Sequence, residues 1–272
     1  MTLPRLLVLA VTLSGPLAGQ YRTARSADYL FAATAADARA LWVNPGGLGV
    51  TYDASVMGEL VADTSRTGSL ALTQVTAGFN SRGIAFGYRR DLYNDTLTGH
   101  TWRIGAGRAL TRVAVGFALA IHSNGDGPTQ RGLDLGVRYR LLSTVELGGT
   151  VRDIGKPIVH DSTLNVSGTA GLGWAPMRSL RLDAQGTVTR VTGGGTATGW
   201  RGGLAFSLGT LALPLHLQAV LGLNRDLVPT RLALALSLGG RDRVVGVVSG
   251  ARPGRRVEMD GISLAGIASR VP

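Results

Sequence analysis

Apolar residues alternate with small or polar ones along most of this 272-residue chain. In residues 111–122, Val113 and Val115 lie on one side of an extended chain, together with the apolar residues that follow at every second position. Ala114 and Gly116 lie on the other side. Because successive side chains of a strand point to opposite faces, this period of two predicts strands with one apolar face.

Fourteen such segments follow one another from residue 54 onward. They span residues 54–62, 68–78, 82–91, 99–109, 111–122, 131–141, 143–153, 164–174, 178–190, 198–208, 213–224, 230–239, 242–250 and 257–268. Most are long enough for a tilted strand to cross a bilayer, which takes about 9–11 residues. Strands of soluble sheets are usually shorter, at about five or six residues.

The connections between these segments alternate in length. Short links at Asn80-Ser81, Leu110 and Leu142 alternate with long polar links such as Ser123–Gln130 and Ile154–Thr163. Transmembrane barrels have short periplasmic turns and longer outer loops, and an even strand count places both ends of the wall in the periplasm. The 40 glycines of the chain also disfavour a helical fold. We therefore predict an all-β protein, a closed antiparallel transmembrane β-barrel of about 14 strands.

The residues before the barrel have a different composition. Residues 1–20 hold one arginine, an apolar run and then small residues, the pattern of a secretory signal peptide. Ser26–Val43 contains seven alanines, with Leu30, Thr34, Asp37 and Leu41 at helical spacing, and Asn44-Pro45-Gly46 would end such a helix. We expect residues 21–50 to form a short helical hatch that plugs the lumen of a barrel made by residues 51–272. The alternative is a helix against the periplasmic rim.

The charge of the chain points to the barrel interior. The formal charge of +11 is the balance of 27 arginines and Lys156 against 17 acidic residues. The arginines are spread along the apolar segments without a nucleic-acid-binding motif, so no nucleic-acid partner is expected. Lipid offers no hydrogen bonds, so the apolar faces must point outward. The predicted lumen-facing charged residues are Arg112, Asp134, Arg138, Arg140, Glu146, Arg152, Arg181 and Asp183, together with Arg201 and Arg231. Two interpretations stay open: these charges pair across the lumen, or they make an electropositive interior that favours anions.

The sequence offers no set of residues for catalysis. It has no cysteine and no cluster of metal-ligating side chains. His122 and Ser123 are adjacent on a predicted strand, so they point to opposite faces and cannot pair. We expect no catalytic residues, no metal, no cofactor and no enzymatic activity.

Two stretches resemble known outer-membrane barrels. The stretch ARALWVNPGGLG is similar to the small-residue helix and NPAGL turn of the FadL-like and PorV/PorQ-like families; Asn44 and Pro45 match, and Gly46 replaces the family's alanine. Leu133–Pro157 resembles a PorV-like strand pair, with Asp153 where asparagine is usual. The resemblance implies a fourteen-stranded barrel with an internal hatch, in which Asn44, Pro45 and Gly46 would form the hatch turn.

From the resemblance we expect a bacterial outer-membrane protein that takes up small hydrophobic or amphipathic solutes through a hatch-gated barrel. The alternative is a PorV-like barrel that anchors type IX secretion subunits or cargo without transport. The expected partners are outer-membrane lipid and either a hydrophobic small molecule or secretion-system proteins. A third possibility is a soluble periplasmic β-sheet protein.

Overall fold

The computed structural model describes residues 26–50, 54–64, 69–92, 98–123, 127–159, 162–191, 195–209, 214–240, 242–251 and 258–270. Within them, the chain after residue 53 is mostly β-strand. The predicted signal peptide, residues 1–20, lies outside the described residues, as do residues 21–25 of the predicted hatch.

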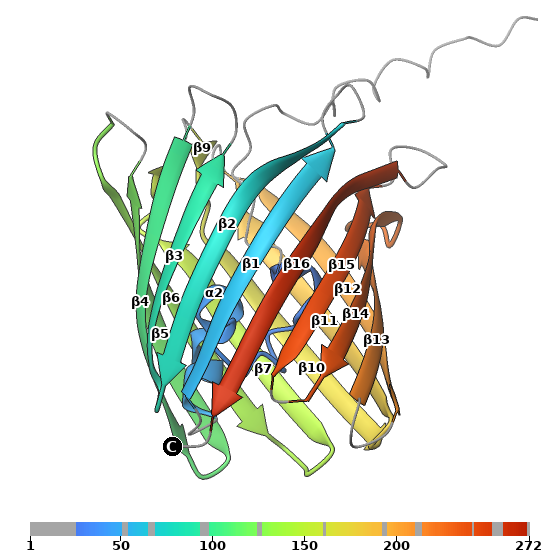
Figure 1. Ribbon diagram of the computed structural model, residues 1–272. Coiled ribbons are helices and arrows are strands. Elements are labelled where there is room, and N and C mark those ends of the chain that lie inside the picture. Colours follow the sequence, from blue (N-terminus) through green and yellow to red (C-terminus); the bar gives the residue numbers. More distant parts are fainter. Residues whose placement is uncertain are drawn as a thin grey trace, which may run out of the picture.

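Fourteen strands form one closed antiparallel barrel, in which the first strand pairs with the last (Figure 1). They are β1 (Ala54–Thr64), β2 (Leu70–Ser81), β3 (Ile84–Leu92), β4 (Thr98–Leu110), β5 (Val113–Ser123), β6 (Gln130–Arg140), β7 (Val145–Ile154), β10 (Ser167–Met177), β11 (Leu180–Arg190), β12 (Thr196–Gly209), β13 (Pro214–Leu223), β14 (Pro229–Gly239), β15 (Arg243–Ala251) and β16 (Glu258–Arg270). The two-residue strands β8 (Ile158–Val159) and β9 (Ser162–Thr163) pair with each other in the link between β7 and β10. The predicted fold class is confirmed, and no predicted strand boundary is more than three residues from the observed one.

The outer surface of the wall is apolar. Leu60, Ile104, Phe117 and Leu234 are each about half exposed, although they stand in the middle of strands. An exposed apolar band around a whole protein would be unstable in water, whereas acyl chains cover it at no cost. Three tryptophans, Trp102, Trp174 and Trp200, also point outward. The wall is therefore a lipid-facing surface, as predicted.

No helix in the described part of the chain combines the length and the apolarity needed to cross a bilayer, a finding that concerns helices alone and says nothing of a β-barrel.

The links between strands differ in length at the two ends of the barrel. Links of two to four residues lie at the end where the chain terminates, and links of five to twelve residues lie at the other end (Figure 1). In the turn between β2 and β3, Arg82 and Gly83 have φ of 51° and 87°. Positive φ at both central residues is typical of the type I′ turn of a tight hairpin. We refer to the end with short links as the periplasmic end.

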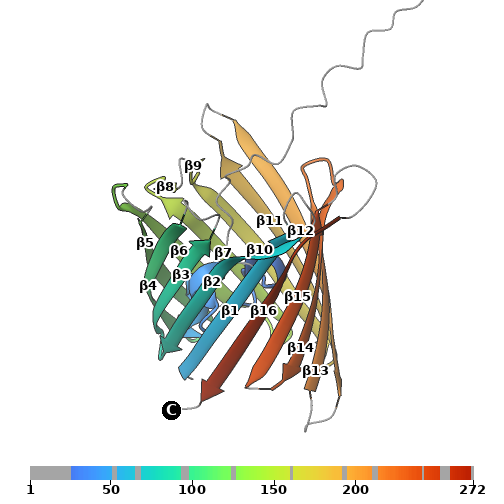
Figure 2. The same ribbon diagram turned by 45° about the horizontal axis from the view of Figure 1, so that its top comes forward.

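The segment before β1 lies inside the barrel. It contains two single-turn helices, α1 (Ser26–Tyr29) and α2 (Ala40–Val43), and the 3₁₀ helix η1 (Pro45–Gly49). We call residues 26–50 the plug. It occupies the lower half of the barrel in Figure 1, and in the turned view of Figure 2 the wall surrounds it.

The prediction of helix across Ser26–Val43 is correct only at its two ends, because residues 30–39 are not α-helical. Wall side chains bind the backbone groups of this stretch, as described below, and so replace the hydrogen bonds of a continuous helix.

Candidate functional site

Glycines on the inner wall let the backbone and side chains of the plug lie directly against it. We call Gly87, Gly105, Gly107, Gly116, Gly136 and Gly148, on strands β3 to β7, the glycine seam. A Cβ atom on Gly136 would lie 2.6 Å from the Gly46 nitrogen, and one on Gly116 would lie 2.6 Å from the Pro45 carbonyl carbon. Any side chain at these two positions would therefore push the plug off the wall.

The Asn44 turn is the most firmly held part of the plug. The fully buried Asn44 amide donates to the carbonyl oxygens of Ala32, at 2.6 Å, and Val137, at 3.0 Å. Its side-chain oxygen accepts from the Gly46 amide at 3.0 Å and caps η1. Asn44, Pro45 and Gly46 are thus fixed to β6 in the conformation shown. Their role as a hinge stays a prediction.

Between Leu30 and Leu41, wall side chains satisfy the plug backbone. Four donate to or accept from it: Arg201 and Arg138 donate to the Leu30 and Ala35 oxygens, and Gln185 and Ser55 accept from the Ala32 and Ala38 amides, at 2.8–3.2 Å. Arg103 donates to the Leu41 oxygen at 3.1 Å. Buried backbone groups need partners, so this part of the plug is stable only while it contacts the wall.

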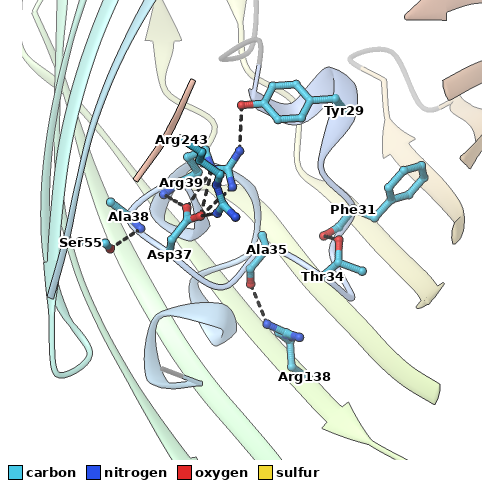
Figure 3. A network of polar contacts seen from close by, with 10 residues as sticks. All are labelled: Tyr29, Phe31, Thr34, Ala35, Asp37, Ala38, Arg39, Ser55, Arg138 and Arg243. Atoms are coloured by element: carbon cyan, nitrogen blue, oxygen red, sulfur yellow. Dashed lines mark hydrogen bonds and ion pairs between the residues drawn. The ribbon is translucent and has the colours of Figure 1, made fainter. Parts of the chain in front are cut away.

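One ion-pair cluster joins the plug to β15 (Figure 3). The Asp37 carboxylate accepts from the backbone amide and the guanidinium of Arg39, the latter at 2.6 Å from Nη2, and from Nη2 of Arg243 in the wall. Arg39 Nη1 also donates to the Tyr29 hydroxyl at 3.1 Å. We call Tyr29, Asp37, Arg39 and Arg243 the latch.

The latch keeps Asp37 ionised. Burial alone would raise the pKa of Asp37, but the charges of Arg39 and Arg243 and the hydrogen bonds from Arg39 outweigh it and hold the pKa well below its usual range. The pKa of Arg39 is raised despite its burial, because Tyr29 and Asp37 favour the charged form. The latch is therefore a charged contact at neutral pH, between the plug and a strand far from the glycine seam.

Further charges pair on the inner wall. Asp134 Oδ2 lies 2.6 Å from Arg103 Nη1 and 3.5 Å from Arg152 Nε. Asp134 Oδ1 accepts from the backbone amide of Asp153, a residue with φ of 57° beside a register shift between β6 and β7. Two of the predicted lumen charges, Asp134 and Arg152, thus fall into one buried network together with Arg103.

A second wall cluster centres on Glu146. Its carboxylate lies 3.1 Å from Arg138, 3.0 Å from Arg181 and 3.9 Å from Arg140. Arg181 also pairs with Asp183 at 3.1 Å. The cluster therefore brings together five of the predicted lumen-facing residues.

Arg112 does not lie on the lumen wall as predicted. It stands in the two-residue turn between β4 and β5 and is exposed, because β5 begins one residue later, at Val113. Arg140 ends β6, with 60% of its side chain exposed. Both arginines belong to the periplasmic mouth of the barrel.

Two arginines that were not among the predicted lumen-facing charges, Arg89 and Arg103, also pack on the plug. Arg89 and Arg103 place their guanidinium carbons 5.7 and 5.1 Å from the ring centre of the buried Trp42, and Arg201 lies 5.1 Å from that of Phe31. Such cation–π contacts stabilise most where water is excluded. The inward register of Arg89 and Arg103 was readable from the strand pattern, but their aromatic partners were not.

The opposite inner wall is apolar. Inward-facing apolar residues of β13 to β16 and β1 form one contiguous surface, which we call the apolar inner wall: Val220, Ala233, Ala235, Val245, Val247, Ala265, Ile267 and Met57. Inward-facing polar side chains of the same strands interrupt it: Glu59, Ser263, Ser249, Gln218, Ser237, Arg231 and Arg243. These side chains belong to the same buried cluster as Tyr29 and Phe31 of the plug. The lumen thus has one side rich in ion pairs and one side on which apolar side chains predominate, and the plug contacts both.

The described residues contain no group of three metal-ligating side chains. His122 points inward and its Nδ1 lies 2.9 Å from Thr101 Oγ1, on the neighbouring strand.

Models of known protein families give no match to this chain, and neither do curated protein sequences. Solved structures do. The Ralstonia pickettii toluene transporter TbuX is 10% identical, with a TM-score of 0.59 over 93% of this chain and 99% of that one. The Pseudomonas putida toluene transporter TodX is 11% identical, with a TM-score of 0.57 over 92% and 97%. A Pseudomonas aeruginosa FadL homologue is 10% identical, with a TM-score of 0.55 over 89% and 95%.

At these identities the likeness concerns the fold. The chain shares the fourteen-strand barrel architecture of FadL-type outer-membrane proteins, in agreement with its lipid-facing exterior. It is an outer-membrane barrel. The part of the predicted resemblance that concerns PorV and PorQ stays a prediction.

Proposed function

We propose that this barrel admits small hydrophobic or amphipathic solutes across the outer membrane by passive movement along the apolar inner wall. The observation that carries the proposal is the wall itself. The interior of a transmembrane barrel is normally polar, because its lumen holds water. Here Val245 and Val247, with their neighbours on β13, β14 and β16, turn apolar side chains inward. The toluene transporters that share the fold are consistent with such a solute.

The plug is the gate in this proposal. Tyr29 and Phe31 pack in the same cluster as the apolar inner wall, so a solute can follow that wall only after they move. The glycine seam and the hydrogen bonds of Asn44 fix the other end of the plug to β6. Residues 26–39 would therefore swing about the fixed turn once the latch opens. Asn44, Pro45 and Gly46 then act as the hinge.

The experiment is uptake of radiolabelled toluene by intact cells, because a plain phospholipid bilayer is itself permeable to apolar solutes. The test variant carries Val245→Gln and Val247→Gln, which makes the apolar inner wall polar. The control is Thr187→Gln, an inward-facing position on β11 outside that wall. We expect the double variant to lose about tenfold in uptake, the effect of about 1.4 kcal/mol on the passing solute.

The control variant should keep wild-type uptake. Equal uptake by cells with and without the protein, or by the wild type and the double variant, would contradict the proposal. Purification of the protein from the same cells tests the alternative of secretion anchoring. Secretion subunits that copurify with it, in cells that show no solute uptake, would favour that role.

A further inference from the structure

A hollow lies at the periplasmic mouth, between the charged side of the lumen and the end of the plug. It has a volume of about 290 Å³. Its lining contains Val50 at the end of η1, Ala114 of β5 and four charged side chains, Arg112, Arg138, Arg140 and Glu146. We call it the arginine mouth.

The charges around the arginine mouth do not balance. Three guanidiniums, those of Arg112, Arg138 and Arg140, line the hollow with one carboxylate, Glu146, which pairs with Arg138 and lies 3.9 Å from Arg140. The neighbouring pair of Arg181 and Asp183 does not change this excess, because the positive charge of Arg181 is offset by the negative charge of Asp183. The hollow therefore carries an excess of about two positive charges.

Two of the three arginine side chains make few contacts with the described protein. Arg140 lies 3.9 Å from Glu146, beyond hydrogen-bond length, and is largely exposed. Within the described residues no side-chain partner of Arg112 is found. The two arginines are neighbours in space, because the backbone amide of Arg140 donates to the carbonyl oxygen of Arg112 at 2.8 Å. Their guanidiniums are therefore available to a ligand.

We propose that the arginine mouth binds one oxyanion group, a carboxylate or a phosphate. Guanidinium groups bind such groups through two parallel charge-assisted hydrogen bonds, and a hollow with an excess of positive charge raises the local concentration of anions. The source of the oxyanion is either a free anion or the head of an amphipathic acid whose chain lies toward the lumen. The site does not depend on solute uptake.

The same geometry connects the site to the plug. Arg138 pairs with Glu146 at 3.1 Å and also donates to the Ala35 carbonyl oxygen of the plug at 2.8 Å. An oxyanion that draws Arg138 toward the mouth weakens one of the contacts that hold residues 30–39 against the wall.

Titration calorimetry of the full chain in non-ionic detergent tests the site, with inorganic phosphate, acetate and hexanoate as probes and chloride as the ionic-strength control. The test variant is Arg112→Gln with Arg140→Gln. The matched control is Arg82→Gln with Arg178→Gln, which removes two exposed arginines from other turns at the same end. The single variant Arg112→Gln tests the site where the double variant folds poorly.

We expect saturable binding that weakens at least about tenfold in the test variant and less than about twofold in the control. Hexanoate that binds much more tightly than acetate identifies an amphipathic acid as the source, whereas equal binding of phosphate and acetate identifies a free anion. Three results would overturn the proposal: no saturable binding, equal binding by the test and control variants, or displacement by chloride at the same concentration. Each can be obtained whether or not the barrel takes up toluene.

Discussion

Replacing Asp37 by asparagine should release the plug. The carboxylate of Asp37 accepts from the backbone amide and the guanidinium of Arg39 and from Arg243. Asp37→Asn keeps the shape of the side chain but leaves two neighbouring guanidiniums without their counter-charge. The side chain of Arg39 is only 7% exposed, so water cannot compensate.

The size of the effect follows from these contacts. Removing one partner of a buried ion pair costs about 3–5 kcal/mol. The side chain of Arg243 is 29% exposed, which screens part of its charge, so we expect about 2–3 kcal/mol for docking of the plug. At about 1.4 kcal/mol for each factor of ten, the undocked fraction rises about 30- to 150-fold.

Trypsin measures this fraction through cleavage after Arg39, which is buried while the plug is docked. Cleavage of a transiently opened segment follows the population of the open state when docking is faster than cleavage. The bond is identified by mass spectrometry, and the control is Asp226→Asn, which removes an exposed carboxylate from the link between β13 and β14. A cleavage rate of Asp37→Asn within twofold of that of the control would refute the role of the latch.

Three further outcomes follow. The depressed pKa of Asp37 contributes docking stability that is complete above the unfolded value near 4 and is lost only as the pH falls below it; the hydrogen-exchange protection of residues 26–43, corrected for the intrinsic pH dependence of amide exchange, should stay constant from pH 7 to about 5 and fall only in stronger acid. Gly136→Ala should raise cleavage after Arg39, since its Cβ meets the plug, whereas Gly168→Ala, with open space around it, should leave the rate unchanged; equal rates would argue against the glycine seam. Arg103→Met leaves Asp134 without its 2.6 Å partner and should lower unfolding stability by about 2–4 kcal/mol, seen as a lower urea midpoint; an unchanged midpoint would mean that this pair does not stabilise the barrel.

The strands were predictable because a bilayer imposes a strict pattern on them. Each residue such as Phe117 or Leu234 faces lipid, and each neighbour faces the lumen, so the period of two survives along the whole wall. Strand length and the alternation of short and long links come from the same constraint. These features depend on local sequence and on the thickness of the membrane.

The plug was not predictable in the same way. Alanines favour a helix, but residues 30–39 lack one because Arg138, Gln185 and Ser55 bind their backbone groups. Those side chains come from strands distant in the sequence, so no local sequence pattern indicates these hydrogen bonds. The pairing of Asp37 with Arg243 likewise joins residues far apart in the sequence. The strand pattern predicts that Arg138 points inward. Its partners could not be predicted, because they come close to it only in the closed barrel.

Arg112 was misplaced for a simpler reason. The register predicted for residues 111–122 is correct for side chains from Val113 onward, and Arg112 has the inward parity. The strand begins later than predicted, so parity no longer determines where its side chain points.

A disulfide between the plug and the wall tests most directly whether the plug must move. A Cβ atom on Gly171 of β10 would lie 3.7 Å from the Ala33 nitrogen, and the sequence contains no cysteine of its own. In Ala33→Cys with Gly171→Cys, oxidation should reduce uptake of the labelled aromatic probe by intact cells to the level of cells without the protein, and reduction should restore it. Undiminished uptake by the oxidised, fully cross-linked protein would contradict a plug-gated barrel.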